Sequence, residues 1–149
     1  MYAPEKNVTR GDFAKLLVET LDLDSDEETI MFKDVKESDY YYEAIKIAKQ
    51  LRIAQGNNRL FSPKSPITRQ DMAVLTIRAL EVNKLIELPN ENDKLVRFKD
   101  SNSISKYAEQ AMNKLVQLEL IKGNEGKISP LDALTRAELA VFLHRLYNL

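Results

Sequence analysis

The sequence contains no cysteine and a single histidine, His144. The absence of cysteine excludes a disulfide framework and any metal site with cysteine ligands. One histidine leaves a histidine-based metal site without partners, so we expect neither a metal nor a cofactor. No nucleophile–base–acid set, phosphate-binding loop or paired-carboxylate motif stands out in the chain. We therefore expect a protein that is not an enzyme.

An excess of charge of one sign and long apolar runs are also lacking. The formal net charge is -1, which argues against nucleic acid or an anionic membrane as the partner. Any anion site must come from locally placed cations. No apolar run approaches the ~20 residues of a membrane span, and we expect no membrane insertion. The start, Met1 to Lys6, shows no basic segment followed by an apolar one, so we expect no secretion signal there. The sequence start is compatible both with a cytosolic protein and with the mature part of a secreted protein.

A short motif, Thr-Arg-x followed by an acid, occurs three times in the sequence. The length of 149 residues suits a single domain, 1–149. The second and third motifs lie 67 residues apart (Thr68 to Thr135), and many further positions agree at that offset. We therefore divide the domain into a partial first repeat (1–27), a second repeat (28–83) and a third repeat (84–149). The three motifs are Thr9-Arg10-Gly11-Asp12, Thr68-Arg69-Gln70-Asp71 and Thr135-Arg136-Ala137-Glu138.

The apolar spacing in each whole repeat predicts two helices joined by a glycine turn. The opening helices span roughly 41–51 and 108–118, and Gly56 and Gly123 follow them, where we expect a positive φ. A second helix begins at each motif threonine, which gives five main helices with polar loops at about 22–38 and 84–104. No segment alternates with period two over a useful length, so we expect an all-α fold without a real sheet.

The motif arginine needs an explanation that the threonine and the acid do not. Threonine followed three residues later by an acid is a capping box, which stabilises the start of a helix. A cation at the first helical position opposes the helix dipole, yet it occurs in all three copies. One explanation is an anion site, in which free N–H groups of the helix start and the guanidinium bind a carboxylate or phosphate. The other is an ion pair with an acid of a neighbouring repeat, for example Asp34 or Asp100.

These motifs resemble the S-layer homology repeat. The third repeat reads Phe98-x-Asp100, then Tyr107-Ala108-x-x-Ala111-Met112, Gly123, Ile128-Ser129-Pro130 and Leu134-Thr135-Arg136-Ala137-Glu138. The second repeat carries the same order, from Phe32-x-Asp34 to Ile67-Thr68-Arg69-Gln70-Asp71. The resemblance covers nearly the whole chain. It departs from the family pattern where tyrosine replaces a frequent tryptophan, at Tyr40 and Tyr107, and where the first repeat lacks its opening helix.

The resemblance implies both a fold and a function. It implies helix–loop–helix repeats around a pseudo-threefold central helical bundle, with grooves between repeats that bind secondary cell-wall polysaccharide. That glycan is acidic and often carries pyruvate ketals. The expected role is a non-catalytic anchor outside the cell, at the bacterial cell wall or surface layer; the alternative is a helical protein-interaction or self-assembly scaffold of a surface-layer protein. The expected ligand-binding residues are Arg10, Arg69, Arg136, Asp34, Asp100, Gly56, Gly123, Tyr40, Tyr107 and Lys122.

Two smaller expectations concern apolar side chains. Of Tyr40, Tyr41 and Tyr42, we expect one or two in the core and one on the surface, where stacking on a sugar ring is the alternative to a structural role. The helix that starts at Thr9 has an apolar stripe, and its own repeat supplies no opening helix to cover it. We expect part of that stripe to stay exposed and to promote self-association, unless a preceding segment or the 22–38 loop covers it. The stripe consists of Phe13, Leu16, Leu17 and Leu21.

Overall fold

The computed structural model describes residues 3–84, 87–88 and 93–149, and over these residues the chain is all-α, as expected. Short 3-10 turns η1 (Leu95–Arg97), η2 (Ser101–Ser103) and η3 (Lys106–Ala108) lead into the fourth helix. Residues 85–86 and 89–92 of the predicted 84–104 loop lie outside the described residues. Only isolated β-bridges, and no helix suited to crossing a membrane, occur in the described part of the chain. The five α-helices are α1 (Arg10–Thr20), α2 (Tyr42–Gln50), α3 (Arg69–Asn83), α4 (Glu109–Gln117) and α5 (Arg136–Tyr147).

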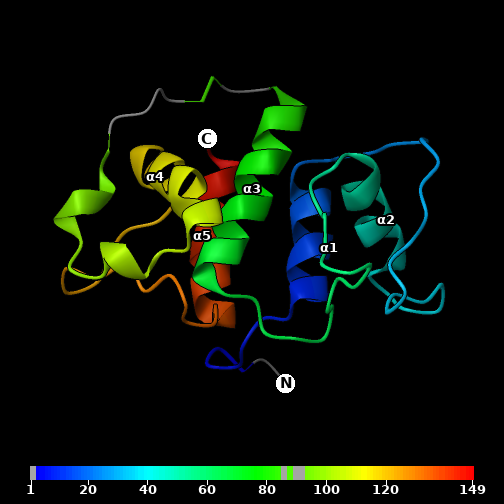
Figure 1. Cartoon of the computed structure of the whole chain (residues 1–149), viewed down its shortest axis with the longest axis horizontal. Helices are drawn as coiled ribbons and strands as arrows, with labels where there is room; N and C mark the ends of the chain where they lie inside the picture. Colours follow the sequence, from blue (N-terminus) through cyan, green and yellow to red (C-terminus); the bar gives the residue numbers. More distant parts are fainter. Residues whose placement is uncertain (1–2, 85–86, 89–92) are drawn as a thin grey trace.

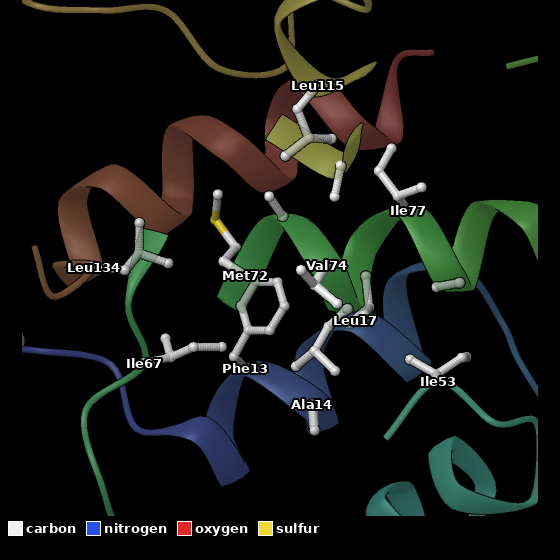
Figure 2. Packing of buried hydrophobic residues seen from close by; sticks show 14 of the residues in the cluster. Phe13, Ala14, Leu17, Ile53, Ile67, Met72, Val74, Ile77, Leu115 and Leu134 are labelled. Atoms are coloured by element: carbon white, nitrogen blue, oxygen red, sulfur yellow. The ribbon is translucent and has the colours of Figure 1, made fainter. Parts of the chain in front are cut away.

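The three helices that begin at the motif arginines form the centre of the molecule, with α2 and α4 on either side (Figure 1). Their apolar faces meet in one core, where the rings of Phe13 and Phe142 have centroids 6.2 Å apart. Phe13 and Leu17 of α1 point towards Met72 of α3 in Figure 2. The expected packing of the three threonine-initiated helices around a pseudo-threefold axis is confirmed.

A closed ring of three backbone hydrogen bonds joins the segments that precede these helices. The N–H of Val8 donates to the carbonyl of Leu134 at 2.8 Å, that of Leu134 donates to Ile67 at 3.0 Å, and that of Ile67 donates to Val8 at 2.9 Å. All three residues are buried. Each repeat therefore donates one bond and accepts one bond, and the ring closes only when all three segments are present.

The threonine at the start of each central helix is an N-cap, as the motif predicted. The hydroxyl oxygens of Thr9, Thr68 and Thr135 each accept a hydrogen bond from the N–H three residues later. The reciprocal half of the capping box forms only in α5, where Glu138 accepts from the N–H of Thr135 at 3.1 Å. The prediction of a full box is therefore confirmed at Thr135, and the other two copies keep the hydroxyl contact alone.

Each opening helix packs against the central helix of the preceding repeat, not against that of its own repeat. α2 lies against α1, and α4 lies against α3 (Figure 1). The expectation that part of the stripe on α1 stays exposed holds for only two of its four residues, because Phe13 is 0% and Leu17 is 1% exposed. Leu16 and Leu21 are only partly buried. Self-association through the first repeat remains a prediction, but Phe13 and Leu17 are already buried in the core and only Leu16 and Leu21 are left to support it.

Candidate ligand grooves between the repeats

Three open grooves lie between successive repeats at pseudo-equivalent positions. Groove A has a volume of about 650 Å³, groove B about 620 Å³ and groove C about 450 Å³. Each contains one motif arginine and the motif acid of the next repeat in the ring. The defining residues of groove A are Arg10, Gly56, Phe61, Asp71, Arg78 and Tyr107; those of groove B are Arg69, Lys122, Gly123, Ile128, Glu138 and Arg145; those of groove C are Asp12, Leu16, Tyr40, Arg136 and Leu139.

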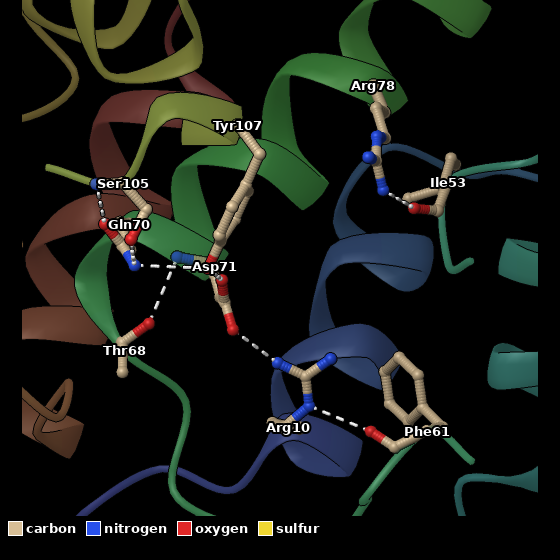
Figure 3. Close-up of polar contacts among 9 residues, drawn as sticks. All are labelled: Arg10, Ile53, Phe61, Thr68, Gln70, Asp71, Arg78, Ser105 and Tyr107. Atoms are coloured by element: carbon tan, nitrogen blue, oxygen red, sulfur yellow. Dashed lines mark hydrogen bonds and ion pairs between the residues drawn. The ribbon is translucent and has the colours of Figure 1, made fainter. Parts of the chain in front are cut away.

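The arginine of groove A bridges two repeats. Arg10 Nε donates to the carbonyl of Phe61 at 2.9 Å, and its Nη1 contacts Asp71 Oδ2 at 2.8 Å (Figure 3). The guanidinium carbon also lies 4.9 Å from the centre of the Phe61 ring. The ion-pair explanation for the motif arginine is therefore realised, but the acid is the one in the neighbouring motif rather than Asp34 or Asp100.

The arginine of groove B repeats this arrangement. Arg69 Nε donates to the carbonyl of Ile128 at 3.2 Å, and its Nη1 forms an ion pair with Glu138. The third arginine, Arg136, lines groove C with Asp12, but the described residues show no ion pair between the two. Tyr2, which would correspond to Phe61 in the sequence, lies outside the described residues. Grooves A and B are therefore the two that share a common geometry.

The helix starts themselves do not offer the free N–H groups that the anion-site explanation required. The N–H groups of Arg10 and Gly11 donate to the carbonyls of Ser65 and Pro63 at 2.9 and 2.8 Å, and the third N–H donates to the Thr9 hydroxyl. The starts of α3 and α5 are bonded in the same way. Anion recognition at these positions therefore depends on the side-chain cations, because the backbone donors are already paired.

The two motif tyrosines lie on groove rims and bind motif acids. Tyr40 and Tyr107 are 66% and 61% exposed, and their hydroxyls donate to Asp12 and Asp71. The hydrogen bond to Asp12 raises the pKa of Tyr40 to about 12, and burial together with the bond to Asp71 raises the pKa of Tyr107 to about 12. Both hydroxyls therefore stay protonated at neutral pH. Tyr41 is buried, which confirms the expectation that one or two of the three adjacent tyrosines lie in the core and one lies on the surface.

Asp34 and Asp100 line none of the three grooves and instead support the groove walls. Asp34 accepts from the N–H groups of Phe61 and Ser62 at 3.0 and 2.7 Å. Asp100 accepts from Ile128 and Ser129 at 2.9 and 2.8 Å. Both serines have a positive φ, at 59° and 52°, directly before a proline. These carboxylates therefore hold the walls in an unusual backbone conformation, and their predicted direct contact with a ligand has no counterpart in the groove linings.

The two turn glycines are required for close packing. A Cβ atom on Gly56 would come within 2.5 Å of the Phe32 ring, and one on Gly123 within 2.3 Å of the Phe98 ring. Gly56 has the expected positive φ of 66°. The same expectation for Gly123 is wrong, since the positive φ values of that turn belong to Glu125 at 53° and Gly126 at 78°. Both glycines let the turn lie flat against a buried phenylalanine at the groove edge.

Cations outnumber acids in all three grooves, by two in groove B and by one in each of grooves A and C. Groove A has Arg10 and Arg78 against Asp71. Groove B has Lys122 among four cations, against two acids, and it is the more basic of the two. Arg78 and Arg145 were not among the predicted site residues, although the repeat alignment pairs them. The groove B cations are Arg69, Lys122, Lys127 and Arg145, and its acids are Asp132 and Glu138.

These features define a class: a closed, pseudo-threefold helical repeat domain whose polar grooves lie between repeats and contain no converging catalytic groups among the described residues. The chain matches the S-layer homology domain at residues 32–73 and 97–140. It belongs to that family, and as such it is a cell-surface anchoring module of the bacterial cell wall.

Several long proteins contain a similar stretch. The exoglucanase XynX of Acetivibrio thermocellus is 32% identical over 146 residues, which are 97% of this chain and 13% of that protein. The cellulosome-anchoring protein of the same species is 28% identical over 97% of the chain and 33% of its own length. The S-layer protein sap of Bacillus anthracis is 25% identical over 96% of the chain and 17% of its own length. The chain thus spans a third or less of these relatives.

Proposed function

We propose that this module attaches a larger protein to the cell wall by binding an acidic wall polysaccharide, with pyruvate ketal carboxylates, in grooves A and B. The single observation that supports this most is the arginine geometry that grooves A and B share, in which a guanidinium fixed by a carbonyl and an acid lies in a groove with an excess of cations. Their volumes, about 650 and 620 Å³, fall within the range typical of ligand sites. A ketal carboxylate supplies the negative charge that such a groove favours.

The arginine contacts suit a recognition role because they fix the guanidinium in place. Two of the five donors of Arg10 are used in contacts to Phe61 and Asp71, which orient the planar group before a ligand arrives. Its charge is only partly offset by Asp71, since Arg78 lies in the same groove and donates to the carbonyl of Ile53 at 3.1 Å. A pre-oriented arginine loses less conformational entropy on binding than a mobile lysine.

The first prediction is that Arg10→Ala and Arg69→Ala each weaken binding to purified acidic wall glycan. Because a hydrogen bond to a charged group is worth about 1.5–3 kcal/mol, affinity should fall about ten-fold or more for the affected groove. Isothermal titration calorimetry with the native glycan, and with glycan from which mild acid has removed the ketals, measures the effect. Ketal removal should weaken the binding of the parent protein in both grooves, and the binding of each variant only in the groove that keeps its arginine.

Arg52→Ala is the matched control, because it removes an exposed arginine that lines none of the three grooves. It should bind like the parent. A competing function is a protein-interaction scaffold in which the arginines only join repeats, and the ion pairs Arg10–Asp71 and Arg69–Glu138 favour it. That reading predicts a lower melting temperature for both variants with unchanged glycan affinity, and such a result would refute the glycan proposal.

A further inference from the structure

A second hollow lies beside groove B, between the short turn η1 and the end of α4, and it has a volume of about 530 Å³. Groove B and this side hollow share two lining residues, Ile121 and Lys122, so one surface runs from the groove into the hollow. Val116 and Ile121 are buried and give the hollow an apolar floor. The side hollow is lined by Lys94, Arg97, Val116, Glu119, Ile121 and Lys122, among others.

Local structure brings two cations of the side hollow to the same side of η1. Lys94 precedes this 3-10 turn and Arg97 ends it, so the two stand three residues apart. Side chains at that spacing on a 3-10 helix lie one above the other. The turn is held in place, since the N–H of Lys94 donates to Asn113 Oδ1 of α4 at 2.9 Å and Leu95 is buried. Lys94 and Arg97 are therefore presented together from an anchored backbone.

Arg97 is oriented by the same aromatic ring that supports the edge of groove B. Its guanidinium carbon lies 4.8 Å from the centre of the Phe98 ring. That ring is buried, and it lies so close to Gly123 of groove B that a Cβ atom there would come within 2.3 Å of it. A guanidinium that is stacked on a ring loses less freedom when it binds an anion. One phenylalanine therefore positions both the groove edge and a cation of the side hollow.

The cations of the side hollow are not balanced by acids. Among the described lining residues, Lys94, Arg97 and Lys122 accompany a single acid, Glu119. Within residues 3–84, 87–88 and 93–149, no ion pair joins any of these three cations to an acid. The motif arginines of grooves A and B, in contrast, each pair with an acid. A concave site lined by one sign of charge attracts the opposite sign, so the side hollow favours an anion.

The second repeat does not carry the two cations of η1. The repeat alignment pairs Lys94 with Glu28 and Arg97 with Met31. Groove A therefore lacks these two cations beside it, although it shares the arginine geometry of groove B. The two grooves should differ in how much of an acidic chain they contact.

We propose that the side hollow is a second subsite of groove B and that it binds the next acidic unit of the same polysaccharide strand. This inference rests on the proposed function, because it extends the ligand proposed for groove B. The ligand is a glycan with a carboxylate on successive units: one carboxylate lies near Arg69, the next lies near Lys94 and Arg97, and Lys122 lies between them. The apolar floor of the hollow suits the C–H face of a sugar ring. A second contact on one strand raises affinity because it forms within the complex.

The test isolates groove B in the Arg10→Ala background, in which groove A is weakened. The probes are size-sorted fragments of the purified acidic wall glycan, with one ketal-bearing unit or with several. Lys94→Ala together with Arg97→Ala should leave the affinity for the one-unit fragment unchanged. The affinity for the longer fragment should fall about three- to ten-fold, since each exposed charge pair contributes modestly. Isothermal titration calorimetry measures both, and the amide NMR signals of residues 94–97 should shift with the longer fragment only.

Three controls accompany this test. In the Arg69→Ala background, where groove B is weakened instead, the same pair of substitutions should change neither affinity. Lys36→Ala with Arg52→Ala removes one exposed lysine and one exposed arginine that line neither groove B nor the side hollow, and this variant should bind like its background. Lys94→Glu with Arg97→Met installs the residues of the second repeat. It should lose at least as much affinity as the alanine pair, and it replaces that pair if the alanine variant does not fold.

Three results would overturn the subsite and leave the proposed function intact. The first is an unchanged affinity for the longer fragment, and the second is an equal loss for both fragments. The third is a loss that persists in the Arg69→Ala background, because the hollow would then be an anion site separate from groove B. If neither fragment binds the parent protein, or if Arg69→Ala binds both as the parent does, the proposed function itself fails and the subsite fails with it.

Discussion

At the scale of the single residue, aspartate and glutamate at the third position of the central helices make different contacts. Glu138 is one methylene longer and reaches back to the N–H of Thr135 while it pairs with Arg69. Asp12 and Asp71 are too short to close the capping box, and each accepts a hydrogen bond from a tyrosine hydroxyl. The motif acid therefore closes the capping box in one copy, where it also lines groove B, and binds a rim tyrosine instead in the other two.

The threonine caps give a prediction for stability. Thr135→Ala removes the oxygen that accepts from the N–H of Glu138, and loss of such a cap costs about 1 kcal/mol of unfolding free energy. Urea denaturation of the purified variant measures the loss. Thr135→Ser is the control, because it keeps the hydroxyl and should stay within a few tenths of a kcal/mol of the parent. Equal stability of the alanine variant would contradict the capping role.

Asp100 gives a prediction for the pH dependence of stability. Burial alone would raise its pKa, but the N–H groups of Ile128 and Ser129 outweigh burial and hold the pKa below its usual value. A depressed folded-state pKa means that the carboxylate stabilises the fold above the unfolded-state pKa of about 3.9 and that this contribution is lost as the pH falls through the folded-state value.

The measurement is the melting temperature from pH 7 down to pH 2 for the parent and for Asp100→Asn. The variant should be less stable at neutral pH, and the difference between the two proteins should shrink below pH 4. Glu37→Gln changes an exposed acid and should follow the parent at every pH. A constant difference between Asp100→Asn and the parent across the range would show that protonation of this carboxyl is irrelevant to stability.

At the scale of the element, the pairing of α2 with α1 makes Gly11 a sensitive position. Alanine in place of glycine normally stabilises a helix by up to about 1 kcal/mol. Here a Cβ atom would approach Tyr41 Cδ1 to 2.8 Å and the Pro63 carbonyl to 3.1 Å. Because Tyr41 is buried and cannot swing away, we expect Gly11→Ala to destabilise the protein by about 1–3 kcal/mol.

Thermal and urea unfolding of Gly11→Ala check the sign of this effect. The control is Ala137→Gly at the equivalent position of α5, which is exposed and should show only the ordinary cost of a glycine in a helix. A stabilised Gly11→Ala protein would mean that α2 does not press against the start of α1.

Helix positions were predictable from the sequence, but helix partners were not. The apolar spacing and the threonine caps located all five helices, since both are local signals. The stripe on α1 carries no mark of which opening helix covers it, so the assumption that each repeat packs within itself was natural and wrong. Pairing across repeats depends on the direction in which the chain leaves the Ser-Pro segment, and that direction is set by tertiary contacts.

The candidate site was predictable to a similar degree. The motif arginines and Tyr107, which the sequence predicted as site residues, do lie in the grooves. They could be predicted because each recurs at the same repeat position, and because an arginine at the start of a helix opposes the helix dipole and so needs another explanation. The backbone contacts of Asp34 could not be predicted, because a carboxylate that accepts from backbone N–H groups looks the same in sequence as one that meets a ligand. Arg78 and Arg145 escaped notice because an arginine inside a helix usually faces solvent, whereas these donate to the carbonyls of Ile53 and Leu120.

At the scale of the whole molecule, the proposed glycan binding depends on where charge is placed rather than on its sum. The net charge of -1 produces no long-range attraction to an acidic wall glycan. Grooves A and B nevertheless concentrate arginine and lysine between the repeats, within a Debye length of the position proposed for the ligand. Binding should therefore weaken with salt less steeply than for a strongly basic protein.

The hydrogen-bonded ring of Val8, Ile67 and Leu134 has a consequence for how the chain unfolds. In an open row of repeats, each unit touches only its neighbours, and the ends can fray separately. Here the first and last segments are bonded to each other, so opening any one segment leaves an unpaired donor and an unpaired acceptor in the buried centre. The ring ties both ends of the chain into one cooperative unit. A force applied to either end of such a molecule should therefore unfold all three repeats in a single step.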